Sequence, residues 1–78
     1  MGLRITNHAK MRMKKYGISE SSLRKGMENP DSVVDGHSGR RIAQRKFNNH
    51  VLRIIFEKRK DKNVIVTVYK ARRERYEI

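Results

Sequence analysis

The spacing of hydrophobic residues changes part way along this chain. Up to Met27 apolar residues recur at intervals of three or four, as on one face of an α-helix, and from Val33 they alternate as in a β-strand. The first pattern predicts two helices, over residues 7–16 and 19–29. The second pattern predicts four strands, over residues 32–37, 40–47, 50–57 and 64–70. Residues 3–6 form either a short further strand or an extended lead-in.

Residues that typically begin or end a helix lie at the predicted boundaries. Thr6 and Asn7 both suit the N-cap of the first helix, and Gly17 suits the left-handed position after its last turn. Ser19 is the predicted N-cap of the second helix. Pro30 ends that helix, because the residue before a proline is pushed out of the helical conformation.

Short connections between the predicted strands favour an antiparallel sheet. Asn48 and Asn49 fit a two-residue hairpin turn, since asparagine tolerates the positive φ angles of such turns, and residues 58–63 fit a polar loop. Two helices followed by four strands indicate an α+β fold, with both helices packed on one face of a four-stranded antiparallel sheet. Residues 1–78 are expected to form one domain.

The predicted strand over residues 50–57 is apolar on both faces, which is typical of the central strand of a sheet. The helices can cover only one of these faces. We expect the other face to be covered in part by the C-terminal tail or by a second copy of the chain in a homodimer, and to display a cationic surface beside that cover.

The hairpin turn determines which residues share this second face. With Asn48 and Asn49 in the turn, Phe47 lies opposite His50 and Gln44 lies opposite Arg53. Slipping the pairing by one residue would move every side chain of the preceding strand to the other face. We favour the first register.

Charge indicates the kind of partner. The chain has 20 Lys and Arg against 8 Asp and Glu, a formal net charge of +12, which favours binding to anions. Residues 27–39 contain no Lys or Arg, whereas residues 40–60 contain eight. This imbalance predicts RNA or another nucleic acid as a direct partner, with an acidic protein as the alternative.

Other classes of protein are disfavoured by composition. The chain has no cysteine, which excludes disulfides and thiolate metal sites, and the spacing of its three histidines matches no metal-binding motif. We therefore expect no metal and no cofactor. No apolar run reaches the roughly 20 residues of a membrane helix, and the first residues lack a signal-peptide core. We expect a cytoplasmic protein that does not contact membranes.

Two stretches resemble known families. "HAKMRMKKYGIS" is similar to the opening signature of a small prokaryotic domain family of unknown function, His-Ala-x-x-Arg-Met-x-x-(Arg/Tyr)-Gly-Ile-Ser. The matching positions are His8, Ala9, Arg12, Met13, Tyr16, Gly17, Ile18 and Ser19. "YKARRERYE" resembles the C-terminal segment of BrnT-type toxins, which belong to the RelE-like superfamily of RNA-cleaving toxins. This resemblance implies a RelE-like fold, ribonuclease activity on messenger RNA that is free or ribosome-bound, and an acidic antitoxin partner.

Metal-independent RNA cleavage needs a base for the 2′-hydroxyl proton, an acid for the leaving 5′-oxygen, and cations for the charge on the phosphate. RelE-like toxins resemble one another in supplying these groups from the sheet and the C-terminal segment. Four residues are our candidates for catalysis: Arg53, Tyr69, Arg72 and His37. Five further cations are expected to bind RNA: Arg40, Lys46, Lys70, Arg73 and Arg75.

The candidates for catalysis also have structural interpretations. Tyr69 suits the edge of a core with its hydroxyl in water, and the stem of Arg53 can cover apolar neighbours. His37, between Gly36 and Gly39, is equally well explained as a turn residue. The C-terminal arginines form either an RNA contact or a solvated tail. Three functions therefore stay open: a toxin that cleaves RNA, a non-catalytic nucleic-acid-binding domain, and a module that docks an acidic antitoxin-like segment.

Overall fold

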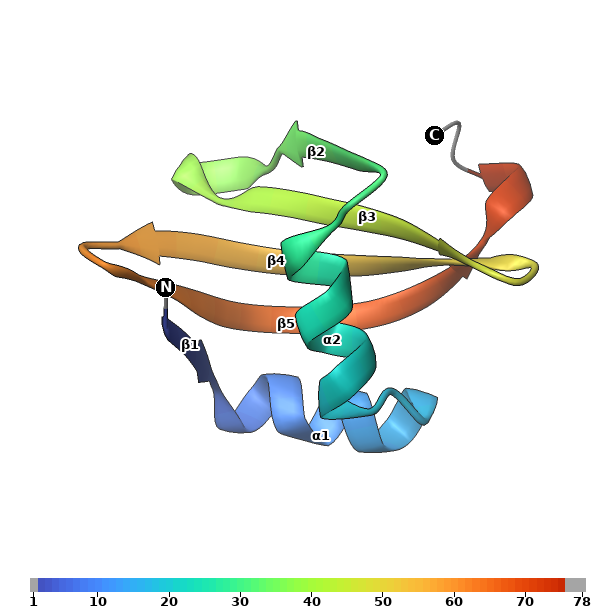
Figure 1. Cartoon of the computed structure of the whole chain (residues 1–78), viewed down its shortest axis with the longest axis horizontal. Helices are drawn as coiled ribbons and strands as arrows, with labels where there is room; N and C mark the ends of the chain where they lie inside the picture. The colour runs from blue at the N-terminus through green and yellow to red at the C-terminus, as the bar shows by residue number, and fades with distance from the viewer. Residues whose placement is uncertain (1, 76–78) are drawn as a thin grey trace.

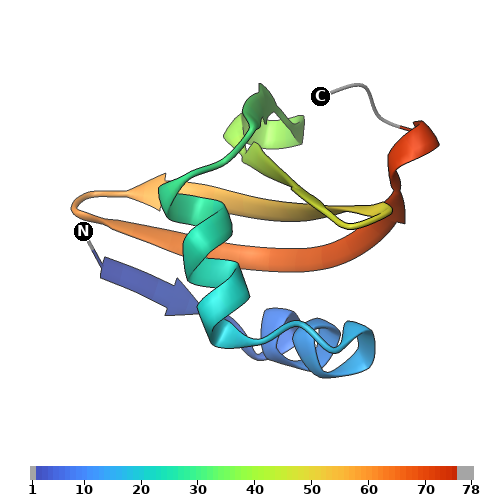
Figure 2. The same ribbon diagram turned by 45° about the vertical axis from the view of Figure 1, so that its right-hand side comes forward.

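A mixed five-stranded sheet with two helices on one face forms the computed structural model, which describes residues 2–75 (Figures 1 and 2). The helices are α1 (Asn7–Tyr16) and α2 (Glu20–Glu28), and two 3₁₀ turns are η1 (His37–Gly39) and η2 (Arg73–Arg75). The strands are β1 (Gly2–Ile5), β2 (Ser32–Asp35), β3 (Arg41–Phe47), β4 (His50–Arg59) and β5 (Lys62–Arg72).

The sheet corrects the fold predicted from the sequence. Its strand order is β1-β5-β4-β3-β2, and β1 runs parallel to β5, so the sheet is not the four-stranded antiparallel one expected. Residues 3–6 belong mainly to a strand because Leu3 and Ile5 pack against the core while their backbone pairs with the edge of β5. A four-residue segment carries too little periodicity to predict this pairing.

The predicted helix caps are confirmed. Thr6 Oγ1 accepts a hydrogen bond from the Ala9 N–H at 3.1 Å, and Ser19 Oγ accepts one from the Ser22 N–H at 3.1 Å. Gly17 follows α1 with a φ of 66°, in the left-handed region that glycine adopts without strain. Thr6 Oγ1 also donates to the Ile65 carbonyl at 2.8 Å, so one side chain caps α1 and fastens it to β5.

Both helices bury their apolar faces on the same side of the sheet. Ala9 and Leu23 are completely buried in a core that they share with Ile54, Ile65 and other apolar residues of β3, β4 and β5. A Cβ atom on Gly26 would lie 2.7 Å from Ile54 Cδ1, so the glycine allows α2 to approach β4 closely. This contact outweighs the roughly 1 kcal/mol by which glycine disfavours a helix.

The favoured hairpin register and the central position of β4 are both confirmed. Phe47 pairs with His50 and Gln44 pairs with Arg53. The loop predicted over 58–63 is shorter than expected, because β4 extends to Arg59 and β5 begins at Lys62. A one-residue shift between β4 and β5 follows Ile55 and leaves Val66 as an extra residue on β5, so Ile65 and Val68 both face the core although they are three positions apart.

Two opposite ends of the sheet are important for the site. The turn between β3 and β4 lies next to η2 at one end, whereas η1 and the turn between β4 and β5 lie at the other (Figure 1). We call the first of these the hairpin end, comprising residues 45–50 and 70–74. We call the sheet surface turned away from the helices the far face.

Candidate nucleic-acid interface

The four residues assigned to catalysis lie in three separate places. Arg53 and Tyr69 are cross-strand partners on the far face. Arg72 comes three positions after Tyr69 on β5, so strand alternation places it on the helix side at the hairpin end. His37 lies in η1 at the opposite end of the sheet (Figure 1). The structure therefore brings Arg53 and Tyr69 together and separates them from Arg72 and His37.

A row of polar side chains crosses the far face. Cross-strand pairing places Tyr69, Arg53, Gln44 and Ser32 side by side on β5, β4, β3 and β2. Arg53 Nη1 donates to Tyr69 Oη at 2.6 Å, and the guanidinium lies 5.7 Å from the centre of the tyrosine ring. Gln44 Nε2 donates to Ser32 Oγ at 2.9 Å. We call these four residues the polar row.

The polar row is shielded from solvent. Gln44 is 4% exposed, Arg53 and Tyr69 are half-buried, and the neighbouring Val51 is completely buried. Gln44 Oε1 has no hydrogen-bond partner among residues 2–75. Polar groups bonded to one another at low exposure order a sheet face, and their bonds would have to break before they could bind a ligand. The polar row therefore resembles a structural network more than a phosphate site.

The hairpin end carries exposed cations on the helix side. Two cross-strand rows follow one another there: Arg72, His50 and Phe47 in the outer row, and Lys70, Leu52 and Arg45 in the inner row. Every side chain of the outer row is exposed, whereas Leu52 in the inner row belongs to the core. The outer row is therefore exposed to solvent, and it lies next to an inner row whose middle residue, Leu52, is packed in the core.

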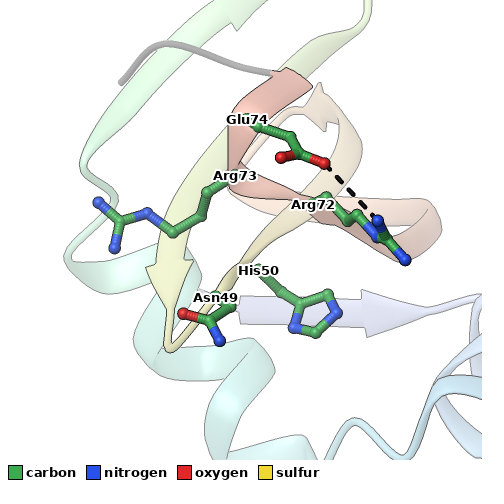
Figure 3. A pocket seen from close by; sticks show the side chains of 5 residues that line it. All are labelled: Asn49, His50, Arg72, Arg73 and Glu74. Carbon is green, nitrogen blue, oxygen red and sulfur yellow. Dashed lines mark ion pairs between the residues drawn. The ribbon is translucent and has the colours of Figure 1, made fainter.

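An open groove of about 590 Å³ lies at the outer row. The side chains of His50 and Arg72 point to the same side of the hairpin, and Glu74 reaches from η2 toward Arg72 (Figure 3). Arg72 Nη1 lies 3.7 Å from Glu74 Oε1, with side-chain exposures of 76% and 74%. A solvent-exposed ion pair of this kind is weak, so Arg72 can exchange Glu74 for a phosphate.

Arg73 connects η2 to the turn between β3 and β4 through two hydrogen bonds. Its backbone N–H donates to the Asn49 carbonyl at 3.1 Å and its guanidinium donates to the Asn48 carbonyl at 3.3 Å. The Arg73 side chain points away from His50 and Arg72 (Figure 3). The backbone of Arg75 belongs to η2, and its side chain lies outside the described part of the chain.

Two hollows flank Phe47, and Ser22 and Leu52 line both of them. The larger hollow, of about 320 Å³, is lined in addition by Lys25, Arg45, Lys46 and Asn48. The smaller hollow is lined by Lys70, whose Nζ lies 5.3 Å from the centre of the Phe47 ring. The aromatic ring therefore borders one hollow that is lined by Lys70 and a second hollow that is lined by three other cations.

The connection between α2 and β2 is hydrogen-bonded to Arg45 and Lys46, the two β3 residues that line the larger hollow. Arg45 Nη1 donates to the Asn29 carbonyl at the C-cap of α2, at 2.6 Å. The Lys46 backbone N–H donates to Asp31 Oδ2 at 2.7 Å. These bonds fix the end of β3 relative to α2, and the exposed Lys46 side chain is left to extend from a rigid base.

The opposite end of the sheet carries an ion-pair cluster. Arg40 Nε lies 3.0 Å from Glu57 Oε1, and Arg59 Nη2 lies 2.9 Å from Glu57 Oε2. Hydrogen bonds from Arg40 and then from Arg59 lower the pKa of Glu57 below its ordinary value. Arg40, predicted to bind RNA, is therefore engaged with a carboxylate far from the hairpin end.

Sequence reasoning missed Phe47 and His50 as members of a site. Their pairing across the hairpin was predicted, but Arg72 was expected on the other face, with Arg53. A one-residue shift in the pairing of β4 and β5 after Ile55 brings Arg72 opposite His50. Reading the polar segment 58–63 as a tight turn would by itself have placed Ala71 there.

Two features that often identify a function have no counterpart in residues 2–75. No group of three or more His, Asp or Glu side chains lies close enough together to hold a metal ion. None of the helices described combines the length and the apolar character needed to cross a membrane.

Comparison with known proteins identifies a family for this chain. The model of a family described as a domain of unknown function, DUF4258, matches residues 5–70, which include both helices, β2, β3, β4 and most of β5. This confirms the prediction of a small uncharacterised domain family. No curated protein and no solved structure matches the chain.

Proposed function

The chain belongs to the DUF4258 family, whose description assigns no function, and from its geometry we propose that it is an RNA-binding module. One observation supports this function above all. Cations from α2, β3, β5 and η2 gather at the hairpin end around an exposed aromatic ring. Among the described residues that line the groove and the two hollows, Glu74 is the one acidic side chain.

The physical basis is the release of counterions from the RNA backbone. Each phosphate neutralised by Lys or Arg frees a condensed cation, which makes the binding strong at low salt and weak at high salt. Arg72 suits this role because its planar guanidinium can make two hydrogen bonds to one phosphate. The net charge of +12 adds long-range attraction to the same partner.

Paired charge variants test this function. Lys70→Gln/Arg72→Gln removes two cations from the hairpin end, and Arg4→Gln/Lys62→Gln removes two from the distant edge of the sheet. We expect the first variant to bind a labelled 12-nucleotide RNA at least about tenfold more weakly, and its salt dependence to fall by about 0.7 per lost contact. The second variant should lose much less.

Three outcomes contradict the proposal in different ways. Equal weakening in both variants would mean that RNA is attracted by the overall positive charge and not by a particular site. Failure of the wild type to bind RNA at low salt would exclude the function itself. Tighter binding to polyglutamate than to RNA would instead support docking of an acidic protein segment of the antitoxin kind.

A second candidate function, RNA cleavage without a metal, is favoured by the groove at the outer row. His50 and Glu74 lie on either side of Arg72 and provide the two groups that acid–base catalysis requires. Glu74 would take the 2′-hydroxyl proton, the 2′-oxygen would attack phosphorus, and His50 would protonate the leaving 5′-oxygen. The products are a 2′,3′-cyclic phosphate and a 5′-hydroxyl. Such an activity would agree with the resemblance to RelE- and BrnT-type toxins.

Cleavage is measured in EDTA, and variants of the groove residues are compared with variants of two candidates that lie elsewhere. We expect His50→Asn and Glu74→Gln to lower the cleavage rate at least about 100-fold, the usual contribution of a general acid or base. Glu74→Gln should nevertheless bind RNA more tightly, because it removes the carboxylate that competes for Arg72. Tyr69→Phe and His37→Asn serve as controls and should retain the rate. Loss of cleavage in Tyr69→Phe alone would return the active site to the far face, and loss in His37→Asn alone would move it to η1.

A further inference from the structure

The larger hollow beside Phe47 has the chemistry of a nucleobase subsite. We propose that one unpaired base stacks on the Phe47 ring there while cations of the hollow bind the adjoining phosphates, so that the preferred ligand is single-stranded RNA. This inference rests on the proposed RNA-binding function and names the substrate class of the same surface. The evidence for this inference is the position of the Phe47 ring and the groups around it.

Phe47 is unusually placed for an aromatic residue in so small a protein. It is 41% exposed, although the core beneath the helices accommodates other large apolar side chains such as Phe56 and Leu23. Lys70 Nζ lies over the ring at 5.3 Å, on the side of the smaller hollow. Lys70 is not among the residues that line the larger hollow, so the part of the exposed ring that borders this hollow is not covered by Lys70 and is available for stacking.

The size and lining of the larger hollow match a base with its phosphates. Its volume of about 320 Å³ is at the lower end of the range for small-ligand sites, roughly 300–1,000 Å³. Lys25 and Arg45 provide positive charge, and Asn48 and Ser22 provide donors and acceptors for the edge of a base. No acidic residue is among the described residues that line it.

A base can reach this ring only if it is unpaired. In a double helix both faces of each base are stacked on neighbouring bases, so proteins read RNA sequence at single-stranded segments by stacking on aromatic side chains. An acidic peptide would use the cations but would gain nothing from the aromatic ring. Phe47 therefore distinguishes single-stranded RNA from other polyanions.

Tryptophan fluorescence tests the stacking directly, because the chain contains no tryptophan. Phe47→Trp places one fluorophore at the proposed subsite. Met11→Trp is the matched control, since Met11 is 71% exposed and shares a cationic hollow on α1 with His8, Arg12 and Lys15. We expect single-stranded RNA to quench the fluorescence of Phe47→Trp, and abasic RNA of equal length and inorganic phosphate to leave it unchanged. Quenching to the same extent in Met11→Trp would overturn the inference.

Affinity provides the second measurement. Stacking on an aromatic ring contributes roughly 5- to 150-fold in affinity per base. Phe47→Leu, which keeps an apolar side chain on Leu52, should therefore bind single-stranded RNA at least about fivefold more weakly, and Phe47→Tyr should bind as the wild type does. Against abasic RNA, the wild type and Phe47→Leu should bind equally.

The outcomes separate this inference from the function on which it depends. If the wild type binds single-stranded, double-stranded and abasic RNA equally, and Phe47→Leu binds like the wild type, the base subsite is wrong and RNA binding stands. If the wild type binds none of the three, the proposed function fails and the subsite with it.

Discussion

Two cation–aromatic pairs lie on β3, β4 and β5, one in each region of the molecule that could be a site. Arg53 lies 5.7 Å from the Tyr69 ring in the polar row of the far face, and Lys70 lies 5.3 Å from the Phe47 ring at the hairpin end. The first pair is half-buried and also joined by a 2.6 Å hydrogen bond. In the second pair the ring is 41% exposed and borders two hollows.

The difference shows that residue type alone does not identify a functional site. An arginine beside a tyrosine suits RNA chemistry, but in the polar row its guanidinium is already bonded and its side chain is half-buried. Arg72 at the hairpin end is exposed, and its ion pair with Glu74 is weak. We therefore expect substitutions in the polar row to change stability, and substitutions at the hairpin end to change binding.

The largest effect on stability is expected for Arg53→Met, which keeps an apolar stem and removes the guanidinium. Losing this donor leaves the Tyr69 hydroxyl without its 2.6 Å bond, and we expect a loss of about 1–3 kcal/mol in the free energy of unfolding. Urea denaturation measures it, with RNA affinity determined on the same samples. Unchanged stability together with lost RNA binding would reverse the assignment of the two regions.

Arg72→Gln should show the opposite behaviour. Its side chain is exposed, so the free energy of unfolding should stay within about 0.5 kcal/mol of the wild type. RNA binding should weaken by roughly tenfold, because a hydrogen bond to a charged group contributes about 1.5 kcal/mol. Anisotropy titration and urea denaturation of one preparation give both values, and Arg4→Gln is the control.

Gln44 and Ser32 allow a finer test of the polar row. Ser32→Ala removes the acceptor of Gln44 Nε2, and we expect a loss of about 1 kcal/mol in unfolding free energy. Gln44→Leu removes the whole buried amide, including the Oε1 that lacks a partner among residues 2–75, and should cost less or stabilise the protein. A larger loss in Gln44→Leu than in Ser32→Ala would show that the amide has a further partner.

The smallest effect is expected at Glu57, where the ion-pair cluster is largely solvated. The unfolded chain binds this proton near pH 4.3, whereas the pKa of Glu57 is lower in the folded protein. The cluster's contribution is therefore fully present above about pH 4.3 and is lost as the pH falls through the folded-state pKa. Glu57→Gln should unfold with a shallower acid dependence in thermal melts. Parallel curves for both proteins would contradict this.

Most local structure was predictable because it depends on short-range interactions. Thr6, Ser19 and Gly17 define the helix boundaries through bonds to residues within one turn. The register of β3 and β4 follows from a turn of two residues. The strand β1 was not predicted with certainty, because its four residues gain their structure only from β5, about sixty positions away.

The site was harder to predict than the fold. The predicted RNA-binding residues Lys46, Lys70 and Arg73 lie together at the hairpin end, and Arg72 joins them there from the catalytic set. The faces of the β5 residues beyond Val66 depend on the shift after Ile55, which reverses the alternation counted from the turn at Lys60. The sequence pattern did not indicate this shift, so Arg72 was not expected beside His50 and Phe47.

The sequence by itself determined the helix caps, the central apolar strand and an excess of positive charge that favours an anionic partner. Each of these depends on neighbours in the chain or on composition. Only the tertiary structure decided that Arg53 and Tyr69 bond to each other within the sheet, while cations from several elements surround Phe47. The burial of a side chain and the meeting of cations from several elements depend on segments that are distant in the chain and pack together. A local pattern of residues therefore cannot predict them.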